Sequence, residues 1–427
     1  MKSKYKSILI ICGASIREKI AGAGKRSLEV ARCLANNNRV DVLIPNSDPP
    51  KVEDINFISM SKIKLDYDIV ISQSPAEKAF IRSCAFRKLL ARSSKYYDLY
   101  CPTIFEALEK HKNKRKKYLR ERLLIDIERI NLMLELGDYF LCGNERQRKF
   151  YVELADQIGK RINIDIVPFG ISSEAPLHNK AVLKGVIPGI NEGDKVILWW
   201  GGIWSWYDPD LLIRAMSAVK NIDRRIKLFF ASSNPPVRKT RIFDDTHKRV
   251  IELSKRLNLY GKNVFFADDW IDYSDRGNYL LEADAGIVIQ LNTLETFFSC
   301  RARIYDYIWA GLPIIMNEGD TFSELVETKS LGIVHKGGDA GKLAQDIVRL
   351  FKDKAKYETY KMNIEKMKIS MYWEKALEPL TAYIGNMATK TKMSFTEAFR
   401  MYFRIFRYFI RLARFFIGNW NAIEHKF

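Results

Sequence analysis

The chain has 427 residues, of which 47% are hydrophobic and 12% aromatic, so it is not a disordered protein and can form two domains with packed cores. Lysine and arginine number 70 against 51 aspartates and glutamates, and the net charge of +19 predicts an anionic partner: nucleic acid, anionic lipid or a phosphorylated substrate. The six cysteines form no CxxC pair, which argues against a disulfide scaffold or zinc site and favours the reduced cytosol.

The first half of the chain alternates short apolar runs with helical patterns. Continuous runs of Val, Ile and Leu separated by helical stretches are typical of parallel sheets built from βαβ units. The predicted strands of this half are Ser7–Cys12, Val40–Ile44, Asp68–Ser72, Asp138–Cys142 and Ile164–Phe169.

A glycine-containing segment, Gly-Ala-Gly-Lys-Arg-Ser from Gly22, follows the first strand and precedes a predicted helix over Leu28–Leu34. Gly22 and Gly24 permit a close backbone approach, and Lys25 and Arg26 add positive charge, so the segment is a candidate phosphate contact. It matches neither a Walker A motif nor GxGxxG. A flexible turn before a helix explains it equally well.

Two basic runs lie in this half. Five basic residues and no acid fall between Arg82 and Lys95, and a second run, Lys110–Lys117, lies on a predicted long helix. Each run alone is more often a solvated face than a binding site.

The second half repeats the alternation, and two such series predict two α/β domains joined near residues 170–187. Ligands of open parallel sheets bind at the carboxyl ends of the strands, so we expect a ligand in a cleft between the domains. The predicted strands of this half are Val196–Trp200, Ile226–Phe230, Val264–Phe266, Ala285–Gln290, Pro313–Met316 and Gly332–His335.

An aromatic loop opens the second series. The chain reads Trp-Trp-Gly-Gly-Ile-Trp-Ser-Trp-Tyr-Asp-Pro over Trp199–Pro209. Rings beside the Gly201-Gly202 pair are suited to stacking on a sugar or a base. Filling a contact between the domains is an equally good explanation.

The most informative stretch is Leu294–Ile315. It joins Glu295, a short loop, a helix carrying Arg301, Arg303 and Asp306, and a Gly-Leu-Pro turn into a strand. A loop feeding into a helix leaves free backbone N–H groups at the positive end of the helix dipole, where phosphates bind. The sequence therefore predicts a phosphate site, with an amphipathic helix and solvated arginines as the alternative.

The C-terminal segment is amphipathic in an unusual way. From residue 399 nearly every position that is not arginine is apolar, and the arginine spacing places all of these side chains on one helix face. This pattern predicts a helix over residues 394–417 that lies on an anionic membrane surface. Packing on the protein's own body and a dimer contact are the alternatives. The arginines are Arg400, Arg404, Arg407, Arg411 and Arg414.

No uncharged apolar run reaches the roughly 20 residues that span a bilayer. We therefore expect a cytoplasmic protein, peripheral on the inner face of the cell membrane. There is no Asp-x-Asp pair at a plausible site, so the sequence requires no metal and no cofactor.

Several separate pieces, in this order, resemble GT-B glycosyltransferases, with retaining family 4 and its bacterial enzymes of surface-polysaccharide assembly (lipopolysaccharide or capsule) as the nearest branch. The likeness covers nearly all of residues 6–380. Besides the first glycine segment, the pieces are Tyr97–Pro102, Cys142–Phe150, Val167–Gly170, Trp200–Gly202 and Tyr307–Pro313.

The resemblance implies an α/β fold of two Rossmann-like domains facing a cleft. Residues 1–170 would form the acceptor domain, 171–187 a linker, and 188–385 the nucleotide-sugar donor domain. Residues 386–427 would add the basic aromatic helix. The implied activity is retaining transfer of a sugar, of the hexosyltransferase type, from a nucleotide diphosphate donor to a glycan acceptor, with the nucleotide-sugar as substrate.

The resemblance also implies site residues. The family has two glutamates eight positions apart that contact the sugar and ribose; Asp306 matches the second, Phe298 falls at the first, and Glu295 is the nearest carboxylate. We therefore predict Glu295 and Asp306 as catalytic. The family's arginine and lysine after the first strand of the donor domain are absent, so the remaining predicted donor contacts are Gly22, Gly24, Gly202, Arg301, Arg303 and Asp306.

Membrane attachment suggests a polyprenyl-diphosphate-linked glycan acceptor. A GT-B-like sugar-nucleotide epimerase is a competing function, but it has no use for a membrane helix. A basic nucleic-acid-binding protein is a third, but the charge follows no recognisable nucleic-acid module, so we expect no nucleic-acid partner.

Overall fold

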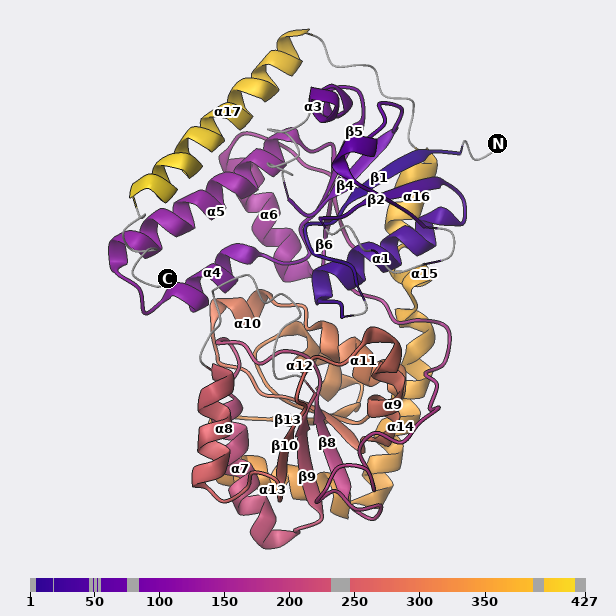
Figure 1. The fold of residues 1–427 in the computed structure, drawn as a ribbon, viewed down its shortest axis with the longest axis vertical. Helices are drawn as coiled ribbons and strands as arrows, with labels where there is room; N and C mark the ends of the chain where they lie inside the picture. The colour runs from indigo at the N-terminus through magenta and orange to yellow at the C-terminus, as the bar shows by residue number, and fades with distance from the viewer. Residues whose placement is uncertain are drawn as a thin grey trace. The chain divides into compact units, whose positions relative to one another are not determined.

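The computed structural model describes residues 5–17, 19–45, 49, 52, 55–74, 84–231, 246–386 and 395–418; of residues 85, 395, 397–398 and 411–418 only the backbone is described. The chain forms two compact units (Figure 1). The first contains Met1–Arg17, Gly22–Pro168 and Leu377–Phe427, and the second contains Glu18–Ala21 and Phe169–Ala376. No described helix is long and apolar enough to cross a bilayer.

The first unit is built on a seven-stranded parallel sheet in the order β3-β2-β1-β4-β5-β6-β7. Five of these strands were predicted, and β3 and β5 were not. The strands are β1 (Ser7–Ile11), β2 (Arg39–Leu43), β3 (Asn56–Ile58), β4 (Ile69–Ser72), β5 (Ser94–Asp98), β6 (Tyr139–Cys142) and β7 (Ile164–Ile166).

Helices cover both faces of this sheet. The register places Tyr96 of β5 beside Tyr139 of β6, and on that face the Tyr383 ring stacks on Tyr139 at 3.8 Å between ring centroids. Tyr97 and Phe140, one residue on, point to the opposite face and its hydrophobic core. The helices are α1 (Gly22–Ala35), η1 (Met60–Lys62), α3 (Cys84–Leu90), α4 (Thr103–His111), α5 (Lys116–Leu136), α6 (Glu145–Gln157), α16 (Glu378–Asn386) and α17 (Phe395–Gly418).

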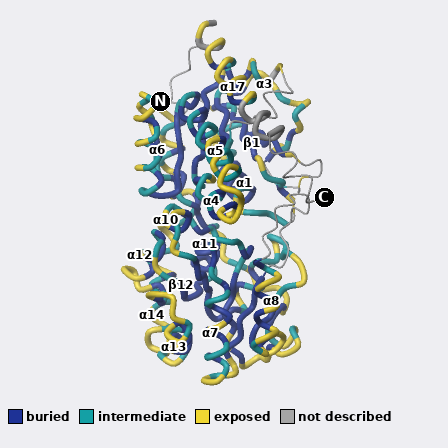
Figure 2. The backbone as a smooth tube through the Cα atoms, turned by 90° about the vertical axis from the view of Figure 1, so that its left-hand side faces the viewer, coloured by how far each residue is buried: buried dark blue, intermediate teal, exposed yellow. Residues whose placement is uncertain are grey.

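The second unit contains a six-stranded parallel sheet in the order β10-β9-β8-β11-β12-β13. All six predicted strands of this half are present, with ends shifted by at most a few residues. They are β8 (Lys195–Trp199), β9 (Ile226–Phe230), β10 (Val264–Phe266), β11 (Ala285–Val288), β12 (Ile314–Asn317) and β13 (Gly332–His335). Most residues of these strands are buried, including Ile314, Ile315 and Met316 of β12, the strand labelled in Figure 2.

Successive strands in this sheet are joined through helices. The order of the strands reverses between β8 and β11, which makes their carboxyl ends the topological switch point where ligands bind in such sheets. The helices of this unit are α7 (Pro209–Ile222), α8 (Thr246–Arg256), η2 (Tyr273–Asp275), α9 (Arg276–Glu282), α10 (Leu294–Phe298), α11 (Ala302–Ala310), α12 (Thr321–Thr328), α13 (Ala340–Lys352), α14 (Lys354–Lys368), η3 (Ile369–Met371) and α15 (Trp373–Ala376).

The two basic runs lie differently from the prediction. Lys110–Lys117 does not lie on one long helix, because α4 ends at His111 and α5 begins at Lys116. In the other run, Lys95 is a buried residue of β5 whose Nζ lies 3.4 Å from the carbonyl oxygens of Leu90 and Ser93. Lys112, Lys114 and Arg115 therefore lie in the turn between α4 and α5, and Lys95 is a satisfied core residue, whereas Arg82 lies outside the described residues.

Candidate functional site

The switch point of the second unit is organised by Tyr307 of α11. The Tyr307 ring lies on Gly286 of β11, where an added Cβ would come within 2.3 Å of it. Its hydroxyl accepts a hydrogen bond from the Trp200 N–H (2.9 Å) and lies 2.9 and 3.0 Å from the carbonyl oxygens of Leu198 and Ile287. Helix α11 is thereby fixed against the ends of β8 and β11.

The loop after β8 depends on its two glycines. Gly201 has φ +78°, a left-handed conformation that side chains rarely adopt. At Gly202 an added Cβ would lie 2.8 Å from the Trp204 ring. The pair therefore lets the backbone turn sharply at the carboxyl end of the strand and lets an indole pack closely against it.

Arg303 reaches this loop from the first turn of α11. It is 7% exposed, and its Nη2 donates to the Gly202 carbonyl oxygen at 2.7 Å. The guanidinium carbon lies 4.4 Å from the ring centroid of Tyr207 and 4.9 Å from that of Trp199. Its Nη1 is buried and has no hydrogen-bond partner among the described residues. Because an unpaired buried N–H of a cation costs free energy, this nitrogen is suited to receive an anionic ligand.

Arg301 is engaged in a different way. Its Nη1 and Nη2 donate to the two carboxylate oxygens of Glu295 at 2.8 and 2.6 Å, and its Nε donates to Gln290 Oε1 at 2.8 Å. Arg301 is 5% and Glu295 6% exposed. Burial alone would lower the pKa of Arg301, but Tyr207 and the Glu295 carboxylate hold it above its ordinary value.

This bidentate pair is a contact that the roles predicted for the two residues did not include. Sequence reasoning gave Arg301 to the diphosphate and Glu295 to the sugar, but each neutralises the other in a buried contact. The pair fixes the loop between β11 and α11. The six-residue spacing carried no signal of the pair, because α10 and the turn after it bring Glu295 back to Arg301.

Three further residues lie near Arg301 and Arg303 in the sequence: the carboxylates Asp306 and Asp320, and Phe298. Asp306 is 7% exposed and follows Arg303 by three residues on α11, so the two share a side of that helix. Phe298 ends α10 with its ring against Phe297. Asp320 is the N-cap of α12 and accepts from the Ser323 N–H; burial raises its pKa and nearby Arg301 opposes that shift.

The two glycines predicted in the first unit lie inside a helix and not in a loop. Helix α1 begins at Gly22, so Gly22 and Gly24 form its first turn. Arg26 of that helix is fully buried; it donates to both carboxylate oxygens of Asp98 at 2.7 and 2.9 Å and to the carbonyl oxygen of Val167 at 2.8 Å. Arg26 therefore ties α1 to β5 and the end of β7. Gly202, Glu295, Arg301, Arg303 and Asp306 all belong to the second unit.

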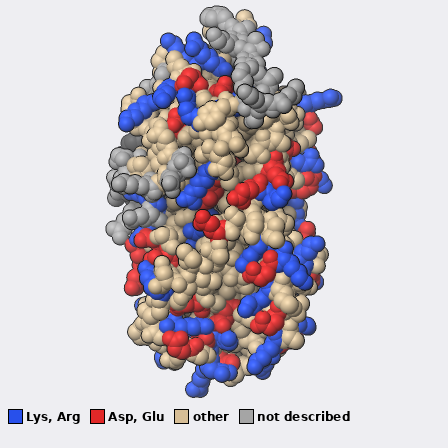
Figure 3. All heavy atoms as spheres, turned by 90° about the vertical axis from the view of Figure 1, so that its right-hand side faces the viewer, with Lys and Arg blue, Asp and Glu red and all other residues tan. Residues whose placement is uncertain are grey.

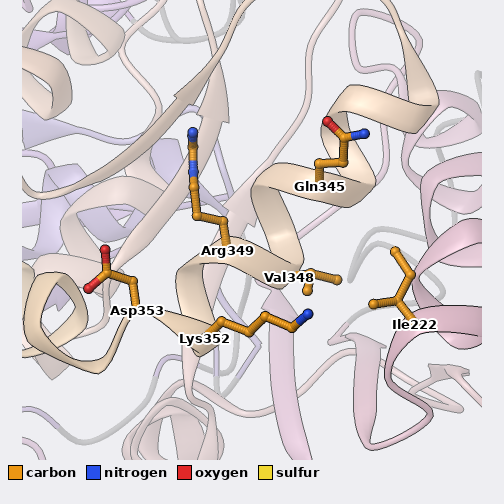
Figure 4. A pocket seen from close by; sticks show the side chains of 6 residues that line it. All are labelled: Ile222, Gln345, Val348, Arg349, Lys352 and Asp353. Carbon is orange, nitrogen blue, oxygen red and sulfur yellow. The ribbon is translucent and has the colours of Figure 1, made fainter.

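The second unit also has a hollow that is not lined by any of the predicted site residues (Figure 4). It is bordered by the C-terminal ends of α7 and α13, which run back from the carboxyl ends of their strands to the amino ends. Its position at the opposite edge of the sheet separates it from Gly202 and Arg303. The lining residues are Ile222, Gln345, Val348, Arg349, Lys352 and Asp353.

Among the described residues no cluster of three His, Cys, Asp or Glu side chains could hold a metal ion.

Comparisons with known proteins agree on the fold. No family model and no curated sequence matches the chain. Among solved structures, Anabaena HepE in complex with UDP and glucose is 13% identical with a TM-score of 0.63, covering 90% of this chain and 100% of its own. Sucrose-phosphate synthase from Thermosynechococcus elongatus is 16% identical (TM-score 0.58; 88% and 98% covered). WaaG, a glycosyltransferase involved in lipopolysaccharide biosynthesis, is 12% identical (0.60; 89% and 100%). At these identities the likeness establishes the fold, which is the predicted α/β fold of GT-B glycosyltransferases.

Proposed function

We propose that this chain is a nucleotide-sugar-dependent glycosyltransferase with its donor site at the β8–β11 switch point of the second unit. The GT-B fold supports this function, because the similar structure of HepE contains UDP and glucose. The observation that carries the proposal is Arg303, a buried cation beside a glycine turn whose Nη1 has no partner within the described residues. A diphosphate supplies the anionic oxygens that this nitrogen lacks.

The reaction breaks the bond between the anomeric carbon and the β-phosphate oxygen of the donor. The bonding electrons leave with that oxygen, giving a nucleoside diphosphate. A hydroxyl oxygen of the acceptor bonds to the anomeric carbon and its proton is released, with the anomeric configuration retained. Catalysis then depends on stabilising negative charge on the leaving diphosphate, for which a positioned guanidinium in a dry site is well suited.

Each predicted residue receives a role from its contacts. Arg303 binds the diphosphate, and Gly202 lets the loop approach it. Asp306, a carboxylate on the same side of α11, accepts hydrogen bonds from sugar or ribose hydroxyls. The buried Glu295–Arg301 pair holds the loop that carries α11 in place. Gly22 and Gly24 contribute free N–H groups at the start of α1 to ligand binding by the first unit.

We further propose that α17 attaches the enzyme to an anionic membrane surface. Its apolar side chains are divided between two faces. Met401, Ile405 and Tyr408 are 2–4% exposed and belong to the core of the first unit. The helix is also tied to α5, because Arg129 donates to the Tyr408 hydroxyl and Arg404 pairs with Glu135 at 3.1 Å.

Packing on the protein's own body therefore explains only one side of α17. Phe399, Phe403 and Phe406 are 61%, 55% and 61% exposed, and their spacing of four and three residues places them on one face. Arg400 and Arg407 lie on the neighbouring face and are exposed. Exposed phenylalanines flanked by arginines suit the headgroup region of an anionic membrane. Arg411 and Arg414 continue the spacing, but their side chains lie outside the described residues.

A membrane-bound enzyme of this kind suits a lipid-linked acceptor, such as a polyprenyl-diphosphate glycan on the cytoplasmic face of the membrane. The product would be a cell-surface polysaccharide of the lipopolysaccharide or capsule type. The resemblance assigns acceptor binding to the first unit, the unit that carries α17.

The direct test is turnover. The purified protein is incubated with UDP-, GDP- and dTDP-linked sugars and a total lipid extract of bacterial membranes. We expect one donor to release its free nucleotide while its sugar moves into the lipid fraction, with the anomeric configuration of the donor. An Arg303→Ala variant should lose this activity. Binding of nucleotides without sugar transfer to any lipid or glycan would contradict the proposal.

A further inference from the structure

The aromatic loop after β8 holds two stacked indoles. The rings of Trp204 and Trp206 are 5.7 Å apart between centroids and inclined by only 23°. Both residues are half-buried, so part of each residue remains accessible, although the Trp206 ring nitrogen is buried. A pair of partly exposed, nearly parallel indoles is an uncommon surface feature, because large aromatic side chains are usually covered in a core or an interface.

The backbone holds this pair in place. The Leu291 N–H donates to the Trp206 carbonyl oxygen and the Asp208 N–H donates to that of Ile289, both at 3.0 Å, on either side of a bridge between Tyr207 and Gln290. The Tyr207 N–H closes the turn by donating to the Trp204 carbonyl oxygen. The loop is thus fastened to the chain that leaves β11, and the indoles need little ordering when a ligand binds.

The pair also lies beside the proposed phosphate contact. The Trp204 ring packs against Gly202, whose carbonyl oxygen accepts the hydrogen bond from Arg303. One residue therefore links the indole to the guanidinium with the unpaired Nη1. A ligand with an anionic group at Arg303 and a ring next to that group would contact both.

We infer that Trp204 and Trp206 form a stacking platform for the sugar ring of the donor. This inference rests on the proposed function. In a nucleotide-sugar the sugar is bonded directly to the β-phosphate, whereas the base is separated from the phosphates by the ribose. The ring nearest to a bound diphosphate is therefore the sugar, and its C–H face packs well on an indole. The GT-B family that this chain resembles has an arginine and a lysine in this loop, and here the loop carries the two indoles instead. This chain therefore holds the donor by ring contact in addition to the charge of Arg303.

The test compares binding of nucleoside diphosphates (UDP, GDP, dTDP) with binding of their sugar conjugates, measured by calorimetry without acceptor. In Trp204→Ala and Trp206→Ala we expect the Kd of the nucleotide-sugar to rise about tenfold, while the Kd of the free diphosphate stays within about twofold. Trp204→Phe, which keeps a ring, should restore most of the affinity. Tyr260→Ala, an exposed aromatic residue away from the loop, serves as the matched control.

The outcomes separate this inference from the proposed function. An equal rise in both Kd values would mean that the indoles contact the nucleotide, and an effect only on the KM of the acceptor would assign them to the acceptor sugar; either result overturns the inference. Unchanged affinities and unchanged kinetics would do the same while the function stands. If the wild-type protein binds no nucleoside diphosphate at all, the proposed function fails first.

Discussion

At the scale of single residues, Arg301 and Arg303 at the start of α11 show how the folded loop gives two similar side chains different partners. Sequence reasoning placed Arg301 and Arg303 together as phosphate contacts, because both precede or begin the helix. Arg301 has its donors directed at Glu295 and Gln290, whereas Arg303 retains an Nη1 with no described partner. The spacing of charges in a sequence cannot distinguish these cases, since the distinction depends on which acceptors the folded loop supplies.

Removing the Arg303 guanidinium should weaken diphosphate binding. A hydrogen bond to a charged group contributes about 1.5–3 kcal/mol, so Arg303→Ala should raise the Kd of a nucleoside diphosphate by roughly 10- to 100-fold. Equilibrium titration checks this. Arg349→Ala, which removes an exposed arginine paired with Asp346, is the control and should leave the Kd unchanged. Equal affinities of Arg303→Ala and the wild type would remove Arg303 from the site.

Breaking the Glu295–Arg301 pair should lower the stability of the protein. Glu295→Ala leaves a buried guanidinium without its carboxylate and should lower the free energy of unfolding by about 3–5 kcal/mol, measured by denaturant unfolding. Glu295→Gln keeps the shape and one acceptor and should cost less. If Glu295 acts in the chemistry instead, Glu295→Gln should abolish turnover without changing stability, which would restore the role expected from the sequence.

At the scale of elements, apolar periodicity found the strands that consist of continuous apolar runs and missed those that do not. Strand β5 reads Ser-Lys-Tyr-Tyr-Asp, yet all five residues are buried. Its lysine is accommodated because Nζ lies near the carbonyl oxygens of Leu90 and Ser93, just before the strand, and near Asp138, which is distant in the sequence. The sequence predicts a helix over residues 394–417, and α17 spans Phe395–Gly418. The division of its apolar residues into a packed and an exposed face was not predicted, since the residues of both faces are apolar.

Substitutions on the two faces of α17 should have opposite effects: those on the exposed face should change membrane binding, and those on the packed face should change stability. Replacing Phe399, Phe403 and Phe406 together by serine should leave the melting temperature nearly unchanged and reduce cosedimentation with phosphatidylglycerol vesicles. A triple replacement of exposed apolar residues in the second unit, Leu177, Tyr260 and Met362, is the matched control and should not affect sedimentation. Undiminished vesicle binding by the phenylalanine variant would argue against the proposed membrane face.

The packed face should behave like a core. Ile405→Ala removes a side chain that is 3% exposed and should lower the free energy of unfolding by about 2–5 kcal/mol. Calorimetric or denaturant unfolding measures this effect. An unchanged stability would mean that α17 is not held against α5 in solution.

At the scale of the whole molecule, the alternation of strands and helices was sufficient to predict an α/β chain with two parallel sheets. It gave no sign that the chain returns to the first unit at Leu377, because that return depends on Tyr383 stacking on Tyr139, far away in the sequence. The net charge of +19 is likewise a property of the chain and not of one site. On the face drawn in Figure 3, basic and acidic side chains are interspersed over the described residues.

The measurement that tests the central claim most directly is thermal or denaturant unfolding in the presence of nucleoside diphosphates. A ligand that binds only the folded protein stabilises it by about 2.7 kcal/mol at 100 times its Kd. We predict such a stabilisation with at least one of UDP, GDP and dTDP. The Arg303→Ala variant should lose this stabilisation, whereas the control Arg349→Ala should keep it. No stabilisation by any nucleoside diphosphate or nucleotide-sugar at millimolar concentration would contradict a donor site in this chain.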